Sequence, residues 1–330
     1  MSAFDRLLQN RVAGVLCFLV ILSLGFGAVA PNFLTVSNAN TIALNGAILV
    51  IVACAEAIVV LTRNYDLSVG STVALAAYVG FDVISRYPEA GPILILLPIL
   101  IGGACGAVNG WLVAYGRVPA VIATLGTMSI YRGIAFLYSR GDQVDQKDLP
   151  AWVAGPVNGQ IGGIAVLPII AIVVVLIAAL LLRRLPIGRQ IYAVGSNPEA
   201  VEYFGLDARR TVFFAYLICG LLTGFAAFLF GARASWIVPY LAQGLELTVL
   251  AAVVIGGVSV LGGSGSLVGA AIGAIAIVTI DNGLILIGTS EFIRQFVQGA
   301  AIIIAVVVDA LIQRRITDLQ LRRRQRKEMA

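Results

Sequence analysis

Long apolar runs separated by short polar segments dominate the chain. A helix needs about 20 apolar residues to cross the hydrocarbon core of a bilayer. Runs of about this length lie at residues 12–30, 41–61, 69–85, 92–115, 119–138, 161–182, 212–232, 245–261, 266–288 and 296–312. The third, eighth and tenth runs are short, so these segments are expected to tilt or to cross only in part. The pattern predicts an all-α polytopic membrane protein with about ten transmembrane helices (eight to ten), forming a single transmembrane domain over residues 1–330.

Two of the polar interruptions between apolar runs are unusually short. Residues 63–71, RNYDLSVGS, interrupt one apolar stretch, and residues 262–266, GGSGS, interrupt another. Non-helical backbone at membrane depth is tolerated only where it is buried in protein or lines a water-filled cavity, and one break in each half of a chain is typical of a repeat-built transporter. Tight turns at the membrane surface explain the two breaks equally well. If the breaks are re-entrant, the number of spans falls and stays even.

Basic residues are distributed unequally between the segments that link the spans. With ten spans and the N-terminus in the cytoplasm, the cytoplasmic segments collect Arg6, Arg11, Arg63, Arg117, the five arginines from Arg183 to Arg210, and the tail from Arg314 to Lys327. The opposite side receives only scattered single residues: Arg86, Arg140, Lys147, Arg233 and Arg294. This asymmetry follows the positive-inside rule and predicts that both termini are cytoplasmic. The basic tail, residues 314–330, is expected to contact anionic lipid.

Composition excludes several classes of protein. The chain is 60% hydrophobic and 12% charged, whereas charged residues make up about a quarter of soluble domains. The net charge of +5 does not indicate nucleic-acid binding, because the basic residues flank apolar runs. The absence of histidine excludes His-ligated zinc and catalytic triads, and the four cysteines lie in apolar runs without CxxC spacing. No cofactor, metal site or catalytic group is predicted, and the first apolar run is interpreted as a retained span.

The polar loop at 188–206, GRQIYAVGSNPEAVEYFGL, is predicted to contain a small cytoplasmic helix. Ser196 or Asn197 is suited to cap it, Pro198 to its first turn and Gly205 to its end. Glu199 follows Ser196 by three residues, as in a capping box. The helix also carries Glu202 near its positive end and the apolar side chains Val201, Tyr203, Phe204 and Leu206. Exposed aromatic side chains predict a partner on the cytoplasmic side, and contact with the membrane interface is the alternative.

Polar side chains within apolar runs are the candidates for a pathway through the membrane. A charge there is costly and usually faces a cavity or a partner. The candidates are Asn45, Glu56, Asn109, Arg132, Asp281 and Asn282. Glu56 and Arg132 are expected to form a buried pair, and Asp281 beside Asn282 lies in mid-span by sequence. Hydrogen bonding between helices is the alternative role for each.

Two further patterns concern packing and the outer surface. Glycines recur every four residues at Gly102, Gly106 and Gly110, and again at 220 and 224 and at 265, 269 and 273, which predicts close helix packing. Residues 139–160 form the longest extracytoplasmic segment, where Asp142, Asp145 and Asp148 are candidates for docking a binding protein. A solvated loop is the simpler interpretation of this segment.

Four segments together resemble a known family. These are DLSVGS at 66–71, NGWLVAYGRVPAVIATLGTMSIYRGIA at 109–135, the loop at 188–206, and AAVVIGGVSVLGGSGSLVGAAIGA at 251–274. In this order they are similar to the ribose-type monosaccharide ABC-importer permeases, and the resemblance runs from residue 32 to residue 309. It implies that residues 196–206 form a coupling helix that seats in a groove of an ATP-hydrolysing subunit. The implied partners are cytoplasmic ABC ATP-binding subunits, a periplasmic sugar-binding protein and a second permease subunit, either a copy or a paralogue.

The resemblance assigns roles to individual residues. The ATPase-coupling residues are expected to be Ser196, Asn197, Pro198, Glu199, Val201, Glu202, Tyr203, Phe204 and Gly205. Independently of the resemblance, polar residues within or near apolar runs are expected to form the translocation pathway: Asp66, Asn109, Arg132, Asp281 and Asn282. The chain has no GxxxxGK[ST] phosphate loop, and GGSGS at 262–266 has no lysine, so ATP is expected to be hydrolysed by the partner and this subunit to be non-catalytic.

The expected function is that of a bacterial inner-membrane permease subunit for import of a monosaccharide, a pentose or a deoxyhexose. Asn64 and Tyr65 precede Asp66 where the family commonly has Gly-Ile, which is compatible with a rhamnose-like cargo. Import of branched-chain amino acids or nucleosides by the same architecture is one alternative. An ion-coupled secondary transporter, which needs no coupling helix, is another, and a membrane-embedded enzyme has little support.

Overall fold

The structure is a computed structural model that describes residues 11–304 and residue 307. The tail at 314–330 and both termini, to which the predicted orientation refers, lie outside the described residues, as does part of the tenth predicted span. The long helices are α2 (Arg11–Val29), α3 (Val36–Val60), α4 (Val69–Arg86), α5 (Leu96–Ala114), α6 (Ala120–Ser139), α8 (Val166–Arg184), α11 (Ala208–Arg233) and α13 (Leu267–Leu286).

Shorter elements connect the long helices. They are η1 (Pro88–Ile95), η2 (Gln146–Asp148), α7 (Ala151–Asn158), α9 (Pro186–Ser196), α10 (Pro198–Tyr203) and α12 (Leu245–Ile255), together with the strands β1 (Val144–Asp145), β2 (Gln160–Ile161), β3 (Ile164–Ala165) and β4 (Trp236–Ile237). Residues 291–304 are also helical.

The predicted spans coincide with helices in the structure. Within the described residues, seven helices are long and apolar enough to cross a membrane: Val12–Val29, Val36–Val60, Pro88–Ala114, Ala120–Ser139, Val166–Arg184, Ala208–Arg233 and Leu267–Leu286. The all-α prediction is confirmed, while the number of crossings stays a prediction. Two predicted boundaries are wrong. Residues 160–165 form the β2–β3 hairpin before α8, and the span predicted at 245–261 ends at Ile255 because two glycines follow it.

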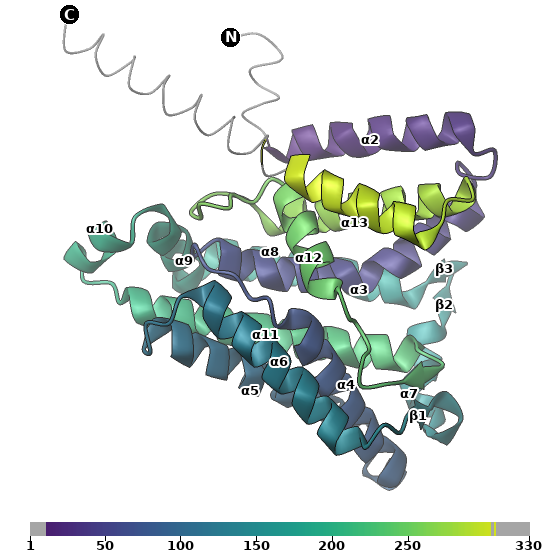
Figure 1. Cartoon of the computed structure of the whole chain (residues 1–330), viewed down its shortest axis with the longest axis horizontal. Helices are drawn as coiled ribbons and strands as arrows, with labels where there is room; N and C mark the ends of the chain where they lie inside the picture. Colours follow the sequence, from purple (N-terminus) through teal and green to yellow (C-terminus); the bar gives the residue numbers. More distant parts are fainter. Residues whose placement is uncertain (1–10, 305–306, 308–330) are drawn as a thin grey trace, which may run out of the picture.

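The helices form a bundle with two different ends (Figure 1). Helices α9 and α10 lie at one end, here called the α10 end, and strands β1–β3 lie at the other, the strand end. Helix α3 is central, since 78% of its most apolar 18-residue stretch is buried within the chain. Helix α2 packs beside α13 at the edge of the bundle, and only 6% of its apolar stretch Val12–Val29 is buried. An apolar helix with so little protein cover is suited to face lipid.

Close packing of α5 on α11 depends on the predicted glycines. A Cβ at Gly102 or Gly106 would overlap the backbone of α11, and a Cβ at Gly220 or Gly224 would overlap that of α5. Small residues allow this approach in a bilayer, where lipid supplies no hydrophobic drive for association. Gly269 and Gly273 contact the backbone of α12 in the same way. The packing role of these glycines is therefore confirmed.

The strand end carries an ordered cap. Strand β1 pairs antiparallel with β4, with Val144 opposite Ile237. Val153 and Val157 of α7 are buried, and Tyr78 donates a hydrogen bond to the carbonyl of Asp142 at 3.0 Å. The segment 139–160 is therefore more ordered than a simple loop, because Val144, Val153 and Val157 are buried, while much of its remaining surface is exposed. Asp142 and Asp148 are exposed, and Asp145 pairs with Lys147 at 3.2 Å.

Candidate functional site

The polar loop at 188–206 folds as two helices, where the sequence predicted one. Residues 186–196 form α9, whose buried side includes Ile191 and Val194. The Ser196 hydroxyl donates to the carbonyl of Tyr192 within α9 at 2.8 Å, so it does not cap the next helix. Asn197 caps α10 instead, since its Oδ1 accepts from the backbone N–H of Ala200 at 3.0 Å. The predicted capping box between Ser196 and Glu199 is therefore wrong.

Helix α10 presents aromatic side chains at the α10 end. It runs from Pro198 to Tyr203, and Gly205 follows with φ 73°, the left-handed conformation that ends a helix. Val201 is buried, while Tyr203 is 91% exposed and Phe204 is 83% exposed. The side chain of Glu202 lies outside the described residues. A short helix with two fully presented aromatics is a surface suited to a partner.

The two breaks predicted from the sequence meet each other and the end of α9. The backbone N–H of Gly263 in the second break donates to the carbonyl of Leu61 beside the first break at 3.0 Å. Arg63 donates from Nε to the carbonyl of Gly195 at 2.5 Å and from Nη2 to that of Ser196 at 2.7 Å. A Cβ at Gly195 would overlap the Leu61 carbonyl. Residues 61–66, residues 260–265 and the last turn of α9 are called the junction below.

Three tyrosines connect the junction to neighbouring elements. Tyr192 of α9 donates to the carbonyl of Gly265 at 3.1 Å, and burial raises the pKa of its hydroxyl, which keeps the donor proton in place. Tyr65 donates to the carbonyl of Val260 at 2.6 Å. Tyr216 of α11 donates to the carbonyl of Tyr65 at 2.8 Å. These contacts tie α11 and α9 to both breaks.

Asp66 is the centre of a buried polar cluster just inside the junction. Its Oδ1 accepts from the Ser68 backbone N–H at 2.9 Å and from the Ser68 hydroxyl at 2.6 Å. The Asn109 amide of α5 donates to both carboxylate oxygens at 3.1 Å. The Tyr131 hydroxyl of α6 donates to the Cys105 carbonyl of α5 at 3.0 Å and lies 3.3 Å from the Asn109 side-chain oxygen. Asp66, Ser68 and Asn109 are buried, so this cluster holds three helices and the first break together.

Glu56 and Arg132 do not pair, and the buried ion pair predicted from the sequence is wrong. Glu56 accepts from the Asp66 backbone N–H at 3.0 Å through Oε1. Arg132 instead donates from Nη1 to the carbonyls of Pro239 at 3.1 Å and Leu241 at 2.8 Å. Arg132 thus binds the chain segment before α12 and not Glu56, and a sequence pattern does not reveal this contact.

Asp281 and Asn282 lie apart from the Asp66 cluster. Asp281 Oδ1 is 3.7 Å from the guanidinium of Arg294, which belongs to the helix at 291–304. Asn282 is buried, and its Oδ1 has no hydrogen-bond partner within the described part of the chain. Of the five pathway candidates, the structure thus joins only Asp66 and Asn109 by hydrogen bonds.

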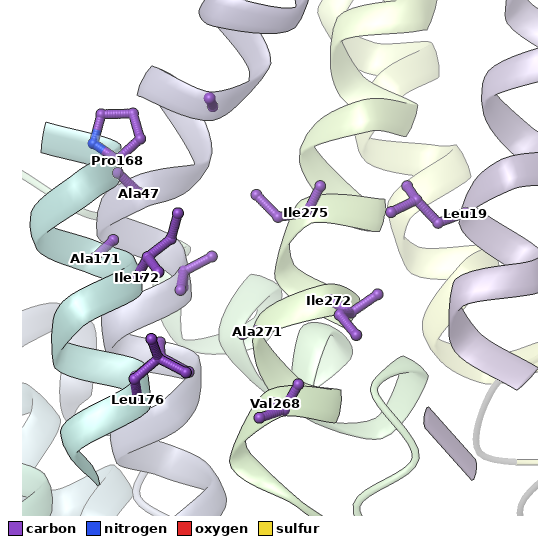
Figure 2. A pocket seen from close by; sticks show the side chains of 13 residues that line it. Leu19, Ala47, Pro168, Ala171, Ile172, Leu176, Val268, Ala271, Ile272 and Ile275 are labelled. Atoms are coloured by element: carbon purple, nitrogen blue, oxygen red, sulfur yellow. The ribbon is translucent and has the colours of Figure 1, made fainter. Parts of the chain in front are cut away.

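A groove between α2, α3, α8 and α13 is lined wholly by apolar side chains (Figure 2). Leu19 of α2 and Ile275 of α13 lie on one side, and Ile172 and Leu176 of α8 on the other. With a volume of about 320 Å³ and no polar side chain in its lining, this groove offers nothing to a hydrogen-bonding solute. It suits hydrocarbon and carries no candidate site.

Sequence reasoning missed several residues of this site. Arg63, Tyr192 and Gly195 hold the junction, yet in the sequence they look like ordinary loop residues. The only signals were that Arg63 begins the first break and that Tyr192 and Gly195 lie in the polar loop at 188–206. Glu246 was also missed, although it lies in the first turn of a short apolar helix, where a charge is conspicuous.

Comparisons with known proteins agree with this architecture. Residues 38–306 match the family described as the permease component of branched-chain amino acid transport systems. The chain is 36% identical over 315 residues to the autoinducer 2 import system permease protein of Enterobacter sp. (strain 638), an alignment that covers 94% of this chain and 90% of that protein. It is 35% identical over 306 residues to the ribose import permease protein of Escherichia coli (strain K12), covering 91% and 93%. No solved structure matches the chain. The extent of these matches, on a polytopic helical chain, shows that it belongs to the ribose-type ABC-importer permease family.

Proposed function

We propose that this chain is the membrane subunit of an ATP-driven importer for a neutral monosaccharide, a pentose or a deoxyhexose, in the bacterial inner membrane. The observation that carries the proposal is the attachment of α10 to the interior of the bundle. Its exposed Tyr203 and Phe204 face away from the chain, and α9 connects them to both breaks. A surface of this kind is required where another subunit supplies the energy.

The proposed coupling follows the hydrogen bonds of the junction. An ATP-hydrolysing subunit that holds α10 and changes its position pulls on α9. Arg63 and Tyr192 transfer this displacement to the first and second breaks. The breaks precede α4 and α13, so a shift of the junction changes the position of helices in both halves of the chain. Rigid helices joined at a shared contact are the kind of element through which alternating access operates.

Support for a sugar as cargo comes from the relatives, whose names specify ribose and autoinducer 2 import. The description of the matched family favours branched-chain amino acids as the second candidate. Asn64 and Tyr65 stand where the family commonly has Gly-Ile. This difference has a structural role at the junction, because Tyr65 contacts Val260 and Tyr216. It therefore bears on coupling more directly than on whether the sugar is rhamnose-like.

The test uses the complex isolated from its own cells through a tag on this chain and reconstituted in liposomes. Accumulation of labelled ribose, arabinose, xylose, rhamnose, fucose and leucine is measured with and without ATP. We expect ATP-dependent accumulation of at least one sugar. In the double variant Tyr203→Ser, Phe204→Ser, the ATP-hydrolysing subunit should no longer copurify and uptake should be lost, while the unfolding temperature stays the same because both side chains are exposed.

Phe292→Ser is the matched control, since Phe292 is 82% exposed and lies in the helix at 291–304, outside α10. It should retain both the partner and the uptake. Accumulation of leucine without any sugar would replace the proposed cargo by the second candidate. Sugar uptake that persists without ATP and collapses with the ion gradient would contradict the proposed energy source.

A further inference from the structure

The chain is interrupted at a third place within the bundle, which the apolar pattern did not reveal. After α11 and β4, residues 238–244 run back into the bundle before α12 begins at Leu245. A Cβ at Gly70 would contact the carbonyl of Ala242 and the carboxylate of Glu246. Gly70 lies sixteen residues before the end of α4 at Arg86, a distance of about 24 Å along the helix. The start of α12 therefore lies beside the first turn of α4, far from the end of α4 at Arg86, and Gln243 and Gly244 next to it are exposed on this chain.

Helix α12 has only 11 residues and lies across the direction of α3 and α13 in Figure 1. Arg132 holds the segment before it through the carbonyls of Pro239 and Leu241. Irregular backbone within a membrane protein is tolerated where it is buried in protein or borders a water-filled cavity. A cavity with polar side chains in its lining opens beside the start of α12.

This cavity has a volume of about 710 Å³, within the range of sites that hold small molecules. It lies between the start of α12, α13 and the helix at 291–304. Its walls combine apolar side chains with four neutral polar ones, Gln243, Thr248, Gln295 and Gln298. Within the described part of the chain, the three glutamine amides have no side-chain hydrogen-bond partner. They are free to bind a solute.

We infer that this cavity is the site at which the permease holds its cargo during passage, and that the cargo it accepts is a neutral polyhydroxylated solute of monosaccharide size. An amide donates and accepts at once, as does a sugar hydroxyl, so a glutamine pairs with hydroxyls in either orientation. The apolar wall formed by Phe230, Leu247 and Ile277 suits the C–H faces of a sugar ring. This inference rests on the proposed import function and specifies where in the chain the cargo is recognised.

The lining also argues against the other cargo classes. Among the residues that the structure describes, no Asp, Glu, Lys or Arg lines the cavity. A zwitterionic amino acid held there would lose water at two charges without an opposite charge on the described walls, which is unfavourable. An inorganic ion would meet the same cost. A neutral sugar does not, since its hydroxyls need only hydrogen bonds.

The test replaces single amides by a side chain of similar size that cannot hydrogen-bond. Gln295→Leu and Gln298→Leu are assayed in the reconstituted complex with the sugar that the wild-type protein accumulates. Each change leaves a sugar hydroxyl unpaired, so we expect the initial uptake rate at low sugar concentration to fall about tenfold per variant. ATP hydrolysis in the absence of sugar and the affinity of the binding protein for the sugar should not change.

Gln160→Leu is the matched control, since Gln160 is exposed in the β2–β3 hairpin outside the cavity, and it should transport at the wild-type rate. A second measurement is independent of coupling: Gln298→Cys is labelled with a small thiol reagent in the purified permease, and the same sugars are added. Millimolar transported sugar should slow this labelling, while leucine should not.

The outcomes separate the two proposals. One outcome is that the wild-type protein accumulates a sugar, that Gln295→Leu and Gln298→Leu accumulate it at the wild-type rate, and that no sugar slows labelling. In that case the cavity assignment is wrong and the import function stands. If the wild-type protein accumulates leucine only, or none of the solutes, both proposals fail. Reduced uptake with unchanged labelling would also overturn the cavity assignment, because it would reflect a structural effect of the substitutions.

Discussion

Single buried polar residues of this chain differ in how completely their hydrogen bonds are satisfied. Asp66 accepts from the backbone and side chain of Ser68 and from Asn109, so its carboxylate is surrounded by donors. Glu56, in contrast, keeps one oxygen without a partner within the described residues. A buried acceptor that loses its donor costs more than the hydrogen bond itself contributed. The stability of the region near the junction should therefore depend strongly on Asn109.

Asn109→Ala is expected to lower the free energy of unfolding by about 1–3 kcal/mol, because it leaves the buried Asp66 carboxylate short of a donor. Thermal unfolding of the purified permease in detergent measures the change. Asn158→Ala, at an exposed position at the end of α7, is the control and should unfold like the wild type. Equal stability of the two variants would show that Asn109 does not support the cluster.

Among the helices and breaks, α9 is the element on which coupling depends. Its sequence includes glycines at 188 and 195, and an interior glycine disfavours a helix by about 1 kcal/mol relative to alanine. Burial of Ile191 and Val194 overrides this preference. Gly195 has a specific role, since it allows the carbonyl of Leu61 and the N–H of Gly263 to approach the backbone of α9.

Gly195→Ala should separate α9 from the two breaks, because its Cβ would overlap the carbonyl of Leu61. We expect less cargo imported per ATP hydrolysed, with normal membrane insertion and with the ATP-hydrolysing subunit still bound. The measurement is the ratio of uptake to hydrolysis in liposomes. Gly126→Ala in α6 is the control, since nothing lies within 4 Å of its added Cβ. An unchanged ratio for Gly195→Ala would exclude the junction as the route of coupling.

Across the whole molecule, the bundle is organised around α3 and around the glycine contact between α5 and α11. The backbones of α5 and α11 touch at Gly102, Gly106, Gly220 and Gly224. Because α5 also carries Asn109 and α11 also carries Tyr216, the same contact fixes the distance between the polar cluster and the junction. Packing of the bundle and coupling are therefore not independent.

Gly220→Val should destabilise the bundle by about 1–3 kcal/mol, the usual cost of overpacking a tight interface. Here the added side chain meets the backbone of α5 at Gly102 and Gly106, which cannot rotate away. Unfolding temperature in detergent is the readout. Gly133→Val in α6 adds the same side chain where a Cβ has no neighbour within 4 Å, and it should leave stability unchanged. A smaller effect at residue 220 than at residue 133 would contradict the predicted role of this contact.

The sequence by itself determined what depends on local composition and order. The apolar runs predicted the positions of the long helices, the glycine spacing predicted tight packing, and Pro198 and Gly205 predicted the bounds of α10. Motifs in a fixed order also predicted the family, which the comparisons confirmed. The helices, the glycine spacing and the bounds of α10 are each encoded within a few tens of residues, and the family in the order of short motifs, so no knowledge of packing was needed.

Tertiary structure alone decided which residues meet. The junction joins Leu61 to Gly263 and Arg63 to Gly195, and Arg132 binds the segment before α12 where Glu56 was expected. Helices such as α13 are apolar on all sides, so their periodicity does not specify which face contacts which neighbour. Only packing of the whole bundle decides which helix faces are in contact. These contacts bring the two breaks together and form the polar cluster and the cavity beside α12.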